Sequence, residues 1–318
     1  MTSEDLREAH ERIRGLIHRT PVMTSATLDR ESGKGVFLKC ENLQRGGAFK
    51  FRGACNAILQ LTAEERARGV VTHSSGNHAQ ALALAARLNG IACRVVMPTS
   101  APEVKRQATR GYGAEIIPCE PTLEARLATA ARVIAKTGAV MIPPYDDDRI
   151  IAGAGTAALE LLDEVGELDA ILAPVGGGGL ISGTALAAQT EARPPRVFGC
   201  EPAGADDAYR SFKSGVRVTQ ATPHTIADGL RTTLGARNFP IIRQYVADIV
   251  LVSEEEILGA MQFIWERTKL IIEPSSAVAV APVLFRTLNL CGQQIGVILS
   301  GGNVDVSEYF ALMRGKRV

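Results

Sequence analysis

The chain of 318 residues lacks any run of apolar residues close to the ~20 that a membrane helix needs. It also lacks a surplus of one charge, because 35 basic and 34 acidic side chains leave a net charge of +1 without any block of lysine or arginine. Such a chain has no electrostatic footprint for nucleic acid or anionic lipid. Its first residues, Met1 to Glu8, are polar and acidic, unlike the basic and then apolar start of a signal peptide. We therefore expect a cytoplasmic protein whose partners include neither nucleic acid nor a membrane.

The cysteines do not occur in the closely spaced pairs that are typical of metal sites. No Cys-x-x-Cys motif occurs, and no histidine stands close enough to a cysteine to complete a zinc pattern. Free cysteine is among the most buried residue types. We therefore expect buried thiols at all six positions, which are Cys40, Cys55, Cys93, Cys119, Cys200 and Cys291.

Short, mostly β-branched apolar segments alternate with helical stretches along the whole chain. This alternation predicts an α/β fold with parallel sheets covered by helices on both faces. We expect a small lobe of residues 68–144, a large lobe of residues 1–67 and 145–318, and a site between the two. The expected strands are 36–38, 70–72, 93–97, 115–117, 170–173, 197–199 and 295–299, and the expected helices include 77–88, 123–136 and 180–189.

Lys50 is the first candidate for chemistry. Phe49 and Phe51 flank it, and Gly46 and Gly47 let the backbone approach a ligand closely. A single lysine of this kind is usually a solvated surface charge. If it is buried, however, desolvation lowers its pKa, so that its amine can condense with an aldehyde near neutral pH and later act as a base.

Two further motifs lie where an expected strand ends and a helix begins. Residues 74–78, with the sequence SSGNH, follow the strand 70–72, and Gly176, Gly177, Gly178 and Gly179 follow the strand 170–173. Free N–H groups at such junctions bind anions, here a carboxylate and a phosphate. The first loop could instead be a plain helix cap. The second could bind NAD, with Glu201 about 20 residues on, but four consecutive glycines fit one phosphate better, and NAD would leave Lys50 without a role.

Taken together, these three motifs are the equipment of a pyridoxal phosphate enzyme. From residues 18–21 to residues 300–303 the chain resembles the fold-type II pyridoxal phosphate enzymes, within them the serine/threonine dehydratase and serine racemase family. The resemblance implies a two-lobed α/β fold like that of the tryptophan synthase β subunit. It also implies a homodimer and pyridoxal 5'-phosphate as the cofactor.

The resemblance further implies a role for individual residues. Lys50 would carry the cofactor and act as a catalytic base, with Ser75 as the catalytic group on the opposite face. Cofactor contacts would come from Phe49, Asn77, Gly176 to Gly179 and Ser300, whose hydroxyl would meet the pyridine nitrogen. The substrate would be held by Ser74, Ser75, Gly76, Asn77 and His78, with Arg126 near the mouth of the site. A divalent cation, Mg²⁺ or Ca²⁺, would be bound by Glu201, the Ala205 carbonyl and Asp207.

The substrate is left open by three departures from the family pattern. Ala48 replaces a common serine, Tyr145 is typical of the dehydratases, and Ala154 replaces a common glutamine. We predict β-elimination of L-serine or L-threonine to a 2-oxo acid and ammonia. The alternatives are serine racemase, which Ser75 favours, and 3-hydroxyaspartate dehydratase or racemase. A non-catalytic carrier of the cofactor would have no use for a carboxylate-binding loop.

Overall fold

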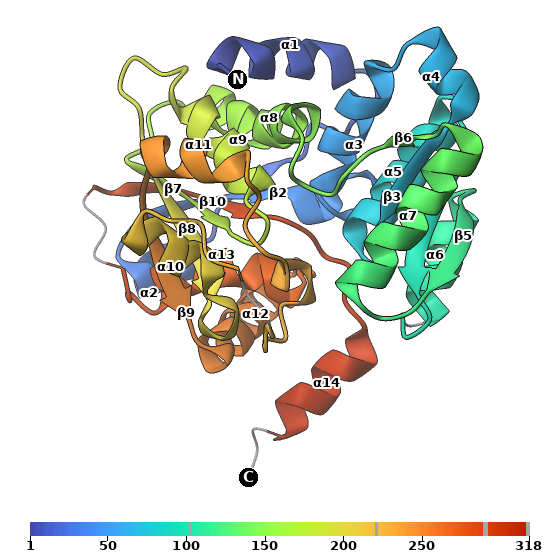
Figure 1. The fold of residues 1–318 in the computed structure, drawn as a ribbon. Coiled ribbons are helices and arrows are strands. Elements are labelled where there is room, and N and C mark those ends of the chain that lie inside the picture. The colour runs from blue at the N-terminus through green and yellow to red at the C-terminus, as the bar shows by residue number, and fades with distance from the viewer. Residues whose placement is uncertain (102, 220–221, 289–291, 316–318) are drawn as a thin grey trace.

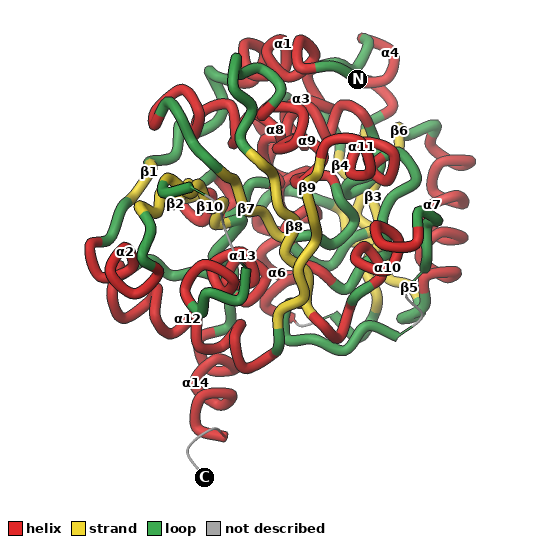
Figure 2. The backbone as a smooth tube through the Cα atoms, turned by 90° about the vertical axis from the view of Figure 1, so that its left-hand side faces the viewer, coloured by secondary structure: helices red, strands yellow, loops and turns green. Residues whose placement is uncertain are grey.

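A computed structural model describes residues 1–101, 103–219, 222–288 and 292–315. Two sheets lie beside one another, and the larger one is built from both ends of the described chain (Figure 1). Its six strands follow the order β1-β2-β10-β7-β8-β9, and all neighbours are parallel except the antiparallel pair β1 and β2. The strands are β1 (Val22–Met23), β2 (Gly35–Cys40), β7 (Ala170–Pro174), β8 (Arg196–Pro202), β9 (Val246–Val252) and β10 (Gln294–Leu299). Figure 2 shows this sheet from the side, with β7, β8 and β9 in the foreground.

The smaller sheet is entirely parallel and has the order β5-β4-β3-β6. Its strands are β3 (Val70–His73), β4 (Cys93–Pro98), β5 (Glu115–Cys119) and β6 (Val140–Met141). All four strands come from within residues 68–144, the stretch expected to form the small lobe. The lobe boundaries themselves stay a prediction.

Helices cover both faces of each sheet. On β7, Leu172 belongs to the apolar cluster shared with α12 and α13, whereas its neighbour Ile171 belongs to the cluster shared with α1, α8 and α9. This alternation is expected for a strand buried on both sides. The helices are α1 (Ser3–Ile13), α2 (Ala26–Ser32), α3 (Lys50–Leu59), α4 (Ala63–Arg68), α5 (Asn77–Leu88), α6 (Glu103–Gly111), α7 (Leu123–Thr137), α8 (Asp148–Val165), α9 (Gly179–Ala188), α10 (Asp207–Ser214), α11 (Asn238–Tyr245), α12 (Glu254–Thr268), α13 (Pro274–Leu284) and α14 (Val306–Gly315).

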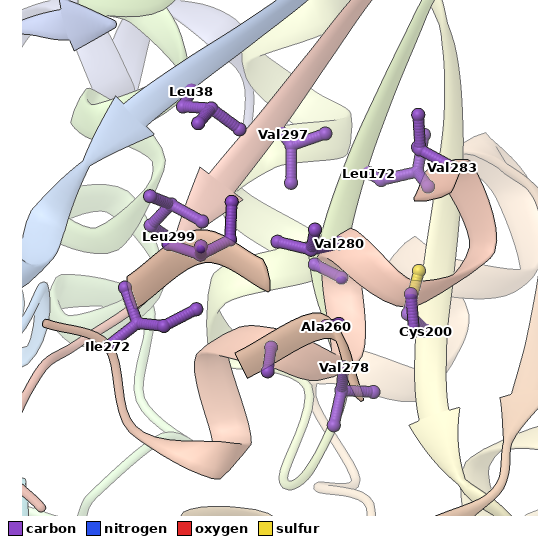
Figure 3. Packing of buried hydrophobic residues seen from close by; sticks show 14 of the residues in the cluster. Leu38, Leu172, Cys200, Ala260, Ile272, Val278, Val280, Val283, Val297 and Leu299 are labelled. Carbon is purple, nitrogen blue, oxygen red and sulfur yellow. The ribbon is translucent and has the colours of Figure 1, made fainter. Parts of the chain in front are cut away.

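Helix α13 is largely apolar around its circumference, which suits a helix that is buried beneath the larger sheet. Figure 3 shows Val280 of this helix near Leu299 of β10, with Val297 and Leu38 above them, and Val278 beside Ala260 of α12. Its first residue, Pro274, suits a helix start because the missing N–H would have no partner there. This packing fixes the position of the residue before the helix, Glu273, at the edge of the site.

Buried ion pairs anchor the start of α3, the helix that begins at Lys50. The Arg52 guanidinium lies 2.7 Å from carboxylate oxygens of both Glu41 and Glu160, and the Lys39 amine lies 2.8 Å from Glu160. All four side chains are at most 1% exposed. Burial alone would raise the pKa of Glu160, but hydrogen bonds with His10 and Arg52 and the charges of Arg52 and Lys39 hold it well below its usual value. The network ties α3 to β2 and α8 and so fixes the direction in which Lys50 leaves its helix.

The predicted fold class is confirmed, and each expected strand is present within a longer one. Strands β1, β6 and β9 were not predicted: β1 and β6 have only two residues each, too few for a periodic pattern. No helix among the described residues is long and apolar enough to cross a membrane. The thiols of Cys40, Cys55, Cys93, Cys119 and Cys200 are free and buried as expected, while Cys291 lies outside the described residues.

Candidate active site

Lys50 lies at the first position of α3, directly after a tight turn at Gly46 and Gly47. Its amine donates a hydrogen bond to the carbonyl oxygen of Pro144 at 2.7 Å and lies 5.0 Å from the centre of the Phe49 ring. Loss of water around the amine lowers its pKa to about 8, although the negative charge of Glu273 acts in the opposite direction. The group can therefore exchange protons near neutral pH, as a catalytic amine must.

The turn that precedes Lys50 is paired with the segment that follows β10. Phe49 donates its N–H to the Ser300 carbonyl at 3.0 Å, and Gly302 donates to the Gly47 carbonyl at 2.9 Å. A Cβ on Gly47 would collide with the side chain of Asn303, so glycine is needed there for close approach as well as for its positive φ of 72°. The structure thus brings together Phe49, Lys50 and Ser300, three of the predicted cofactor residues.

The predicted carboxylate loop, residues 74–78, connects β3 to α5 and is partly exposed apart from His78. Within the loop, the described residues form one hydrogen bond that involves a side chain. In it, the Ser74 hydroxyl accepts the N–H of Gly76 at 3.3 Å. The Ser75 hydroxyl makes no hydrogen bond to any described residue. Since α5 begins at Asn77, the first N–H groups of the helix are directed toward this loop and can bind an anion.

His78 is the exception within the predicted substrate loop. Its ring is 2% exposed, and Nε2 donates to the Ile142 carbonyl at 3.1 Å. Burial lowers its pKa to about 3, so the imidazole is neutral. The side chain is directed into the protein, and only the backbone N–H of His78 is left to contact a substrate.

The four glycines form a cradle between β7 and α9. Among the described residues, nothing accepts a hydrogen bond from the N–H groups of Gly176, Gly177 or Gly178. A Cβ on Gly177 would collide with the ring of Tyr145, and Gly178 has a positive φ of 93°. Helix α9 begins at Gly179, so its N-terminal dipole adds to this positive potential. The loop has the unpaired N–H donors that a phosphate requires.

Two residues that the sequence did not reveal support this cradle. The Asn238 side chain, fully buried, donates to the Gly177 carbonyl at 3.0 Å and to the Tyr145 carbonyl at 3.3 Å. The Thr232 hydroxyl is buried without a hydrogen-bond partner, and it lies 3.0 Å from where a Cβ on Gly176 would be. An unpartnered buried hydroxyl is costly, which suggests a ligand beside the glycines. Neither residue stands at a recognisable spacing from the glycine run.

The predicted cation residues lie together at the end of β8 and the start of α10. Glu201 and Asp207 are each 1% exposed, and burial raises the pKa of Glu201 well above its usual value and that of Asp207 to about 6. One carboxylate oxygen of Asp207, Oδ1, has no partner. The described residues contain no group of three or more His, Cys, Asp or Glu side chains that could hold a metal. The predicted set comprises two carboxylates and the carbonyl of Ala205.

Arg126 lies in the second turn of α7, close to the carboxyl ends of β3 and β5. Burial lowers the pKa of His73, which precedes the predicted carboxylate loop, and the positive charge of Arg126 lowers it further. Burial raises the pKa of the Cys119 thiol, and the charge of Arg126 opposes that rise. Its Nε atom is buried without a hydrogen-bond partner. A guanidinium in this position is free to bind an anion that enters beside Ser74.

A model of one protein family, described as pyridoxal-phosphate dependent enzyme, matches residues 13–301. The chain belongs to this family. The serine racemase of Dictyostelium discoideum is 50% identical over 312 residues, which cover 97% of this chain and 96% of that protein. The beta-hydroxyaspartate dehydratase of Paracoccus denitrificans is 48% identical over 96% of this chain and 98% of that protein. The structure of maize serine racemase superimposes with a TM-score of 0.95 at 43% identity, covering 99% of this chain and 97% of that one.

Membership of the family establishes an enzyme that depends on pyridoxal phosphate, and the residues of the site fit that cofactor. The glycine cradle offers unpaired N–H donors, and Lys50 offers an amine with a lowered pKa. Racemases and hydroxyaspartate dehydratases among the relatives support the alternative activities better than the predicted serine/threonine dehydratase.

Proposed function

We propose that this protein racemises serine and eliminates water from small β-hydroxy amino acids, with 3-hydroxyaspartate as its preferred substrate for elimination. Elimination releases a 2-oxo acid and ammonia. The single observation that carries the choice of substrate is the partly buried, unpartnered guanidinium of Arg126 beside the carboxylate loop. Serine has one carboxylate, whereas 3-hydroxyaspartate has a second one for this arginine to bind.

The glycine loop and the Ser300 segment would hold the cofactor. N–H groups of Gly176 to Gly178 would bind its phosphate, and Asn238 would keep the Gly177 carbonyl turned away from that phosphate. Phe49 and Ser300 would position its ring beside Lys50. When bound, pyridoxal phosphate supplies an electron-accepting ring that makes the Cα–H bond of an amino acid acidic.

Lys50 and Ser75 would move protons at Cα from opposite faces. The Lys50 amine, with a pKa of about 8, would remove the Cα proton of the L-substrate, and the β-hydroxyl would take up a proton and leave as water. The released enamine then takes up one water molecule in solution and gives the 2-oxo acid and ammonia. If the Ser75 hydroxyl instead returns a proton to the other face, the D-amino acid forms. The Ser75 hydroxyl supports this role because it makes no hydrogen bond to a described residue.

Replacing Arg126 by alanine should separate the two substrates. We expect kcat/KM for elimination from L-threo-3-hydroxyaspartate to fall by about 100-fold, the loss that follows from removing one charge-assisted hydrogen-bonded pair. The value for L-serine should change by less than about threefold, because serine has no group for Arg126 to bind. Steady-state assays of 2-oxo acid release measure both values.

Arg132→Ala is the matched control, since Arg132 lies on the same helix and contacts Thr129 rather than the loop. It should leave both substrates unaffected. An equal loss with serine and 3-hydroxyaspartate in Arg126→Ala would remove Arg126 from substrate recognition.

A divalent cation at Glu201, the Ala205 carbonyl and Asp207 is part of the proposal. Two buried carboxylates with raised pKa values repel one another, and a hard cation with oxygen ligands would relieve that repulsion. The unpartnered Oδ1 of Asp207 provides a free ligand atom. The Asp207 carboxylate accepts the N–H of Leu234 at 2.7 Å. A cation bound to Asp207 would therefore stabilise the segment that leads from Leu234 to Asn238.

Chelation should therefore destabilise the protein. We expect EDTA to lower the melting temperature by roughly 5 °C, the shift that about 2 kcal/mol gives in a domain of this size, and Mg²⁺ or Ca²⁺ to restore it. Asp207→Asn should abolish the response, whereas Asp206→Asn at the neighbouring residue should keep it. A melting temperature indifferent to EDTA, with no metal found by elemental analysis, would rule the site out. The homodimer and the cytoplasmic location stay predictions.

A further inference from the structure

Glu273 is a buried carboxylate between the two sheets of the molecule. It is 4% exposed and stands at the N-cap position of α13, yet its side chain does not cap its own helix. The side-chain amide of Asn77 donates instead to both carboxylate oxygens, at 2.9 and 3.0 Å. Asn77 belongs to the helix that follows β3 and Glu273 to the helix beneath the larger sheet, so this contact joins the two parts of the site.

Charge surrounds Glu273 without neutralising it. Among the described residues it forms no ion pair. The charged groups that act on it or respond to it are Lys50, Lys105 and Asp228, and Lys105 is itself paired with Asp228. Burial raises the pKa of Glu273 to about 7, and the bond from Asn77 opposes this.

A buried carboxylate without an ion pair is unfavourable, and an amide of the same shape would cost less. The Glu273 carboxylate nevertheless fits here because residue 301 is glycine. A Cβ on Gly301 would lie 2.8 Å from Glu273 Oε1. Perturbed, unpaired carboxylates of this kind cluster at functional sites. The position beside Ser300 and Lys50 places Glu273 within the site.

Asn77 is fixed from two sides. Its Oδ1 accepts a hydrogen bond from the Asn303 side chain at 3.0 Å, and Asn303 also donates to the Gly46 carbonyl at 2.7 Å. The amide oxygen therefore faces Asn303, and the amide nitrogen must face Glu273. A hydrogen-bonded chain thus runs from the turn before Lys50 through both asparagines to Glu273.

We propose that Glu273 is a positioning residue of this site, whose carboxylate fixes the side-chain amide of Asn77 and favours a positive charge on the nitrogen of Lys50. The inference rests on the proposed role of Lys50 as the residue that carries the cofactor. Asn77 reaches the site with one fixed amide orientation, in which the nitrogen faces Glu273 and the oxygen faces Asn303. Lys50 retains a higher pKa than burial alone would give it.

Glu273→Gln tests the charge while it keeps the shape and an oxygen that can accept from Asn77. In the cofactor-loaded protein, we expect the pH at which the visible absorbance changes to fall by about one unit, the effect of removing one neighbouring opposite charge. The pH of the transition falls rather than rises because loss of a negative charge disfavours the protonated nitrogen. Glu254→Gln is the matched control, as Glu254 is partly buried and likewise accepts an N–H, from Ile226. It should leave the transition unchanged.

A second variant tests the orientation of Asn77. Glu273→Asp keeps the charge but withdraws it from the amide, so the transition should stay near that of the wild type while the dissociation constant of the cofactor rises by about tenfold. Either an unshifted transition in Glu273→Gln or unchanged cofactor affinity in Glu273→Asp would overturn the proposal. If Glu273→Gln does not fold, the cofactor affinity of Glu273→Asp decides alone. Failure of the role of Lys50 itself would be distinguished by Lys50→Ala, which would then keep the visible absorbance.

Discussion

Lys50→Ala should abolish 2-oxo acid release and remove the visible absorbance of the bound cofactor. The amine of Lys50 is the one that the structure places beside Phe49 and the Ser300 segment, with its pKa lowered to about 8. Loss of both the attachment point and the base should reduce the rate by more than about 1,000-fold. Absorption spectroscopy and a 2-oxo acid assay on the purified variant check the two expectations.

Lys105→Ala provides the control, because Lys105 is a partly exposed lysine that pairs with Asp228 close to the site. It should keep the visible absorbance. Reduction with borohydride followed by peptide mass spectrometry should label Lys50 in the wild type. Labelling of a different lysine would disprove the assignment.

Ser75→Ala should separate racemisation from elimination. Without the hydroxyl on the second face, D-serine formation from L-serine should fall by at least about 100-fold, the usual contribution of one acid or base. Elimination from the L-substrate should survive within roughly threefold, because it needs only the face served by Lys50. Elimination from a D-substrate should be lost with racemisation. Chiral chromatography and 2-oxo acid assays on the same incubations give all three rates.

Ser74→Ala is the matched control for this serine. The Ser74 hydroxyl accepts the N–H of Gly76 and so shapes the loop, so its loss should weaken substrate binding in both reactions alike. If Ser75→Ala instead lost L-serine elimination as severely as D-serine formation, the assignment of separate faces to Lys50 and Ser75 would be wrong.

The sequence predicted the parts of the site whose chemistry is local. A glycine run between a strand and a helix indicates an anion site, although it left a dinucleotide open. The loop at residues 74–78 indicates a second anion site, although it left a plain helix cap open. The structure confirms both junctions, between β7 and α9 and between β3 and α5. Expected strands were located for the same reason, since a buried parallel strand has a continuous apolar pattern of its own.

Contacts between residues far apart in the chain could not be predicted from local sequence patterns. Glu273 is 196 residues from Asn77 in the chain, and its sequence context, a residue before a proline at a helix start, indicates only a helix boundary. Asn238 and Thr232 could not be predicted either, because they lie outside every motif and approach the glycine loop only in the folded chain. The ion pairs of Arg52 depend on partners in β2 and α8 that only the packed fold brings together.

The prediction for His78 shows the converse limit. Its position in the loop predicts a substrate contact, which its backbone N–H could make, and that contact stays a prediction. The sequence did not show that the first turn of α5 directs the side chain toward Ile142. Side-chain direction on a helix follows from the packing of that helix, which residue spacing alone does not specify.

We propose that one site, with Lys50 on one face of Cα and Ser75 on the other, both racemises and dehydrates. The most direct test is to incubate the wild-type enzyme with L-serine and to measure D-serine by chiral chromatography and 2-oxo acid in the same sample. Both products should accumulate together, and neither should form with Lys50→Ala. Release of 2-oxo acid without any D-serine would contradict this proposal.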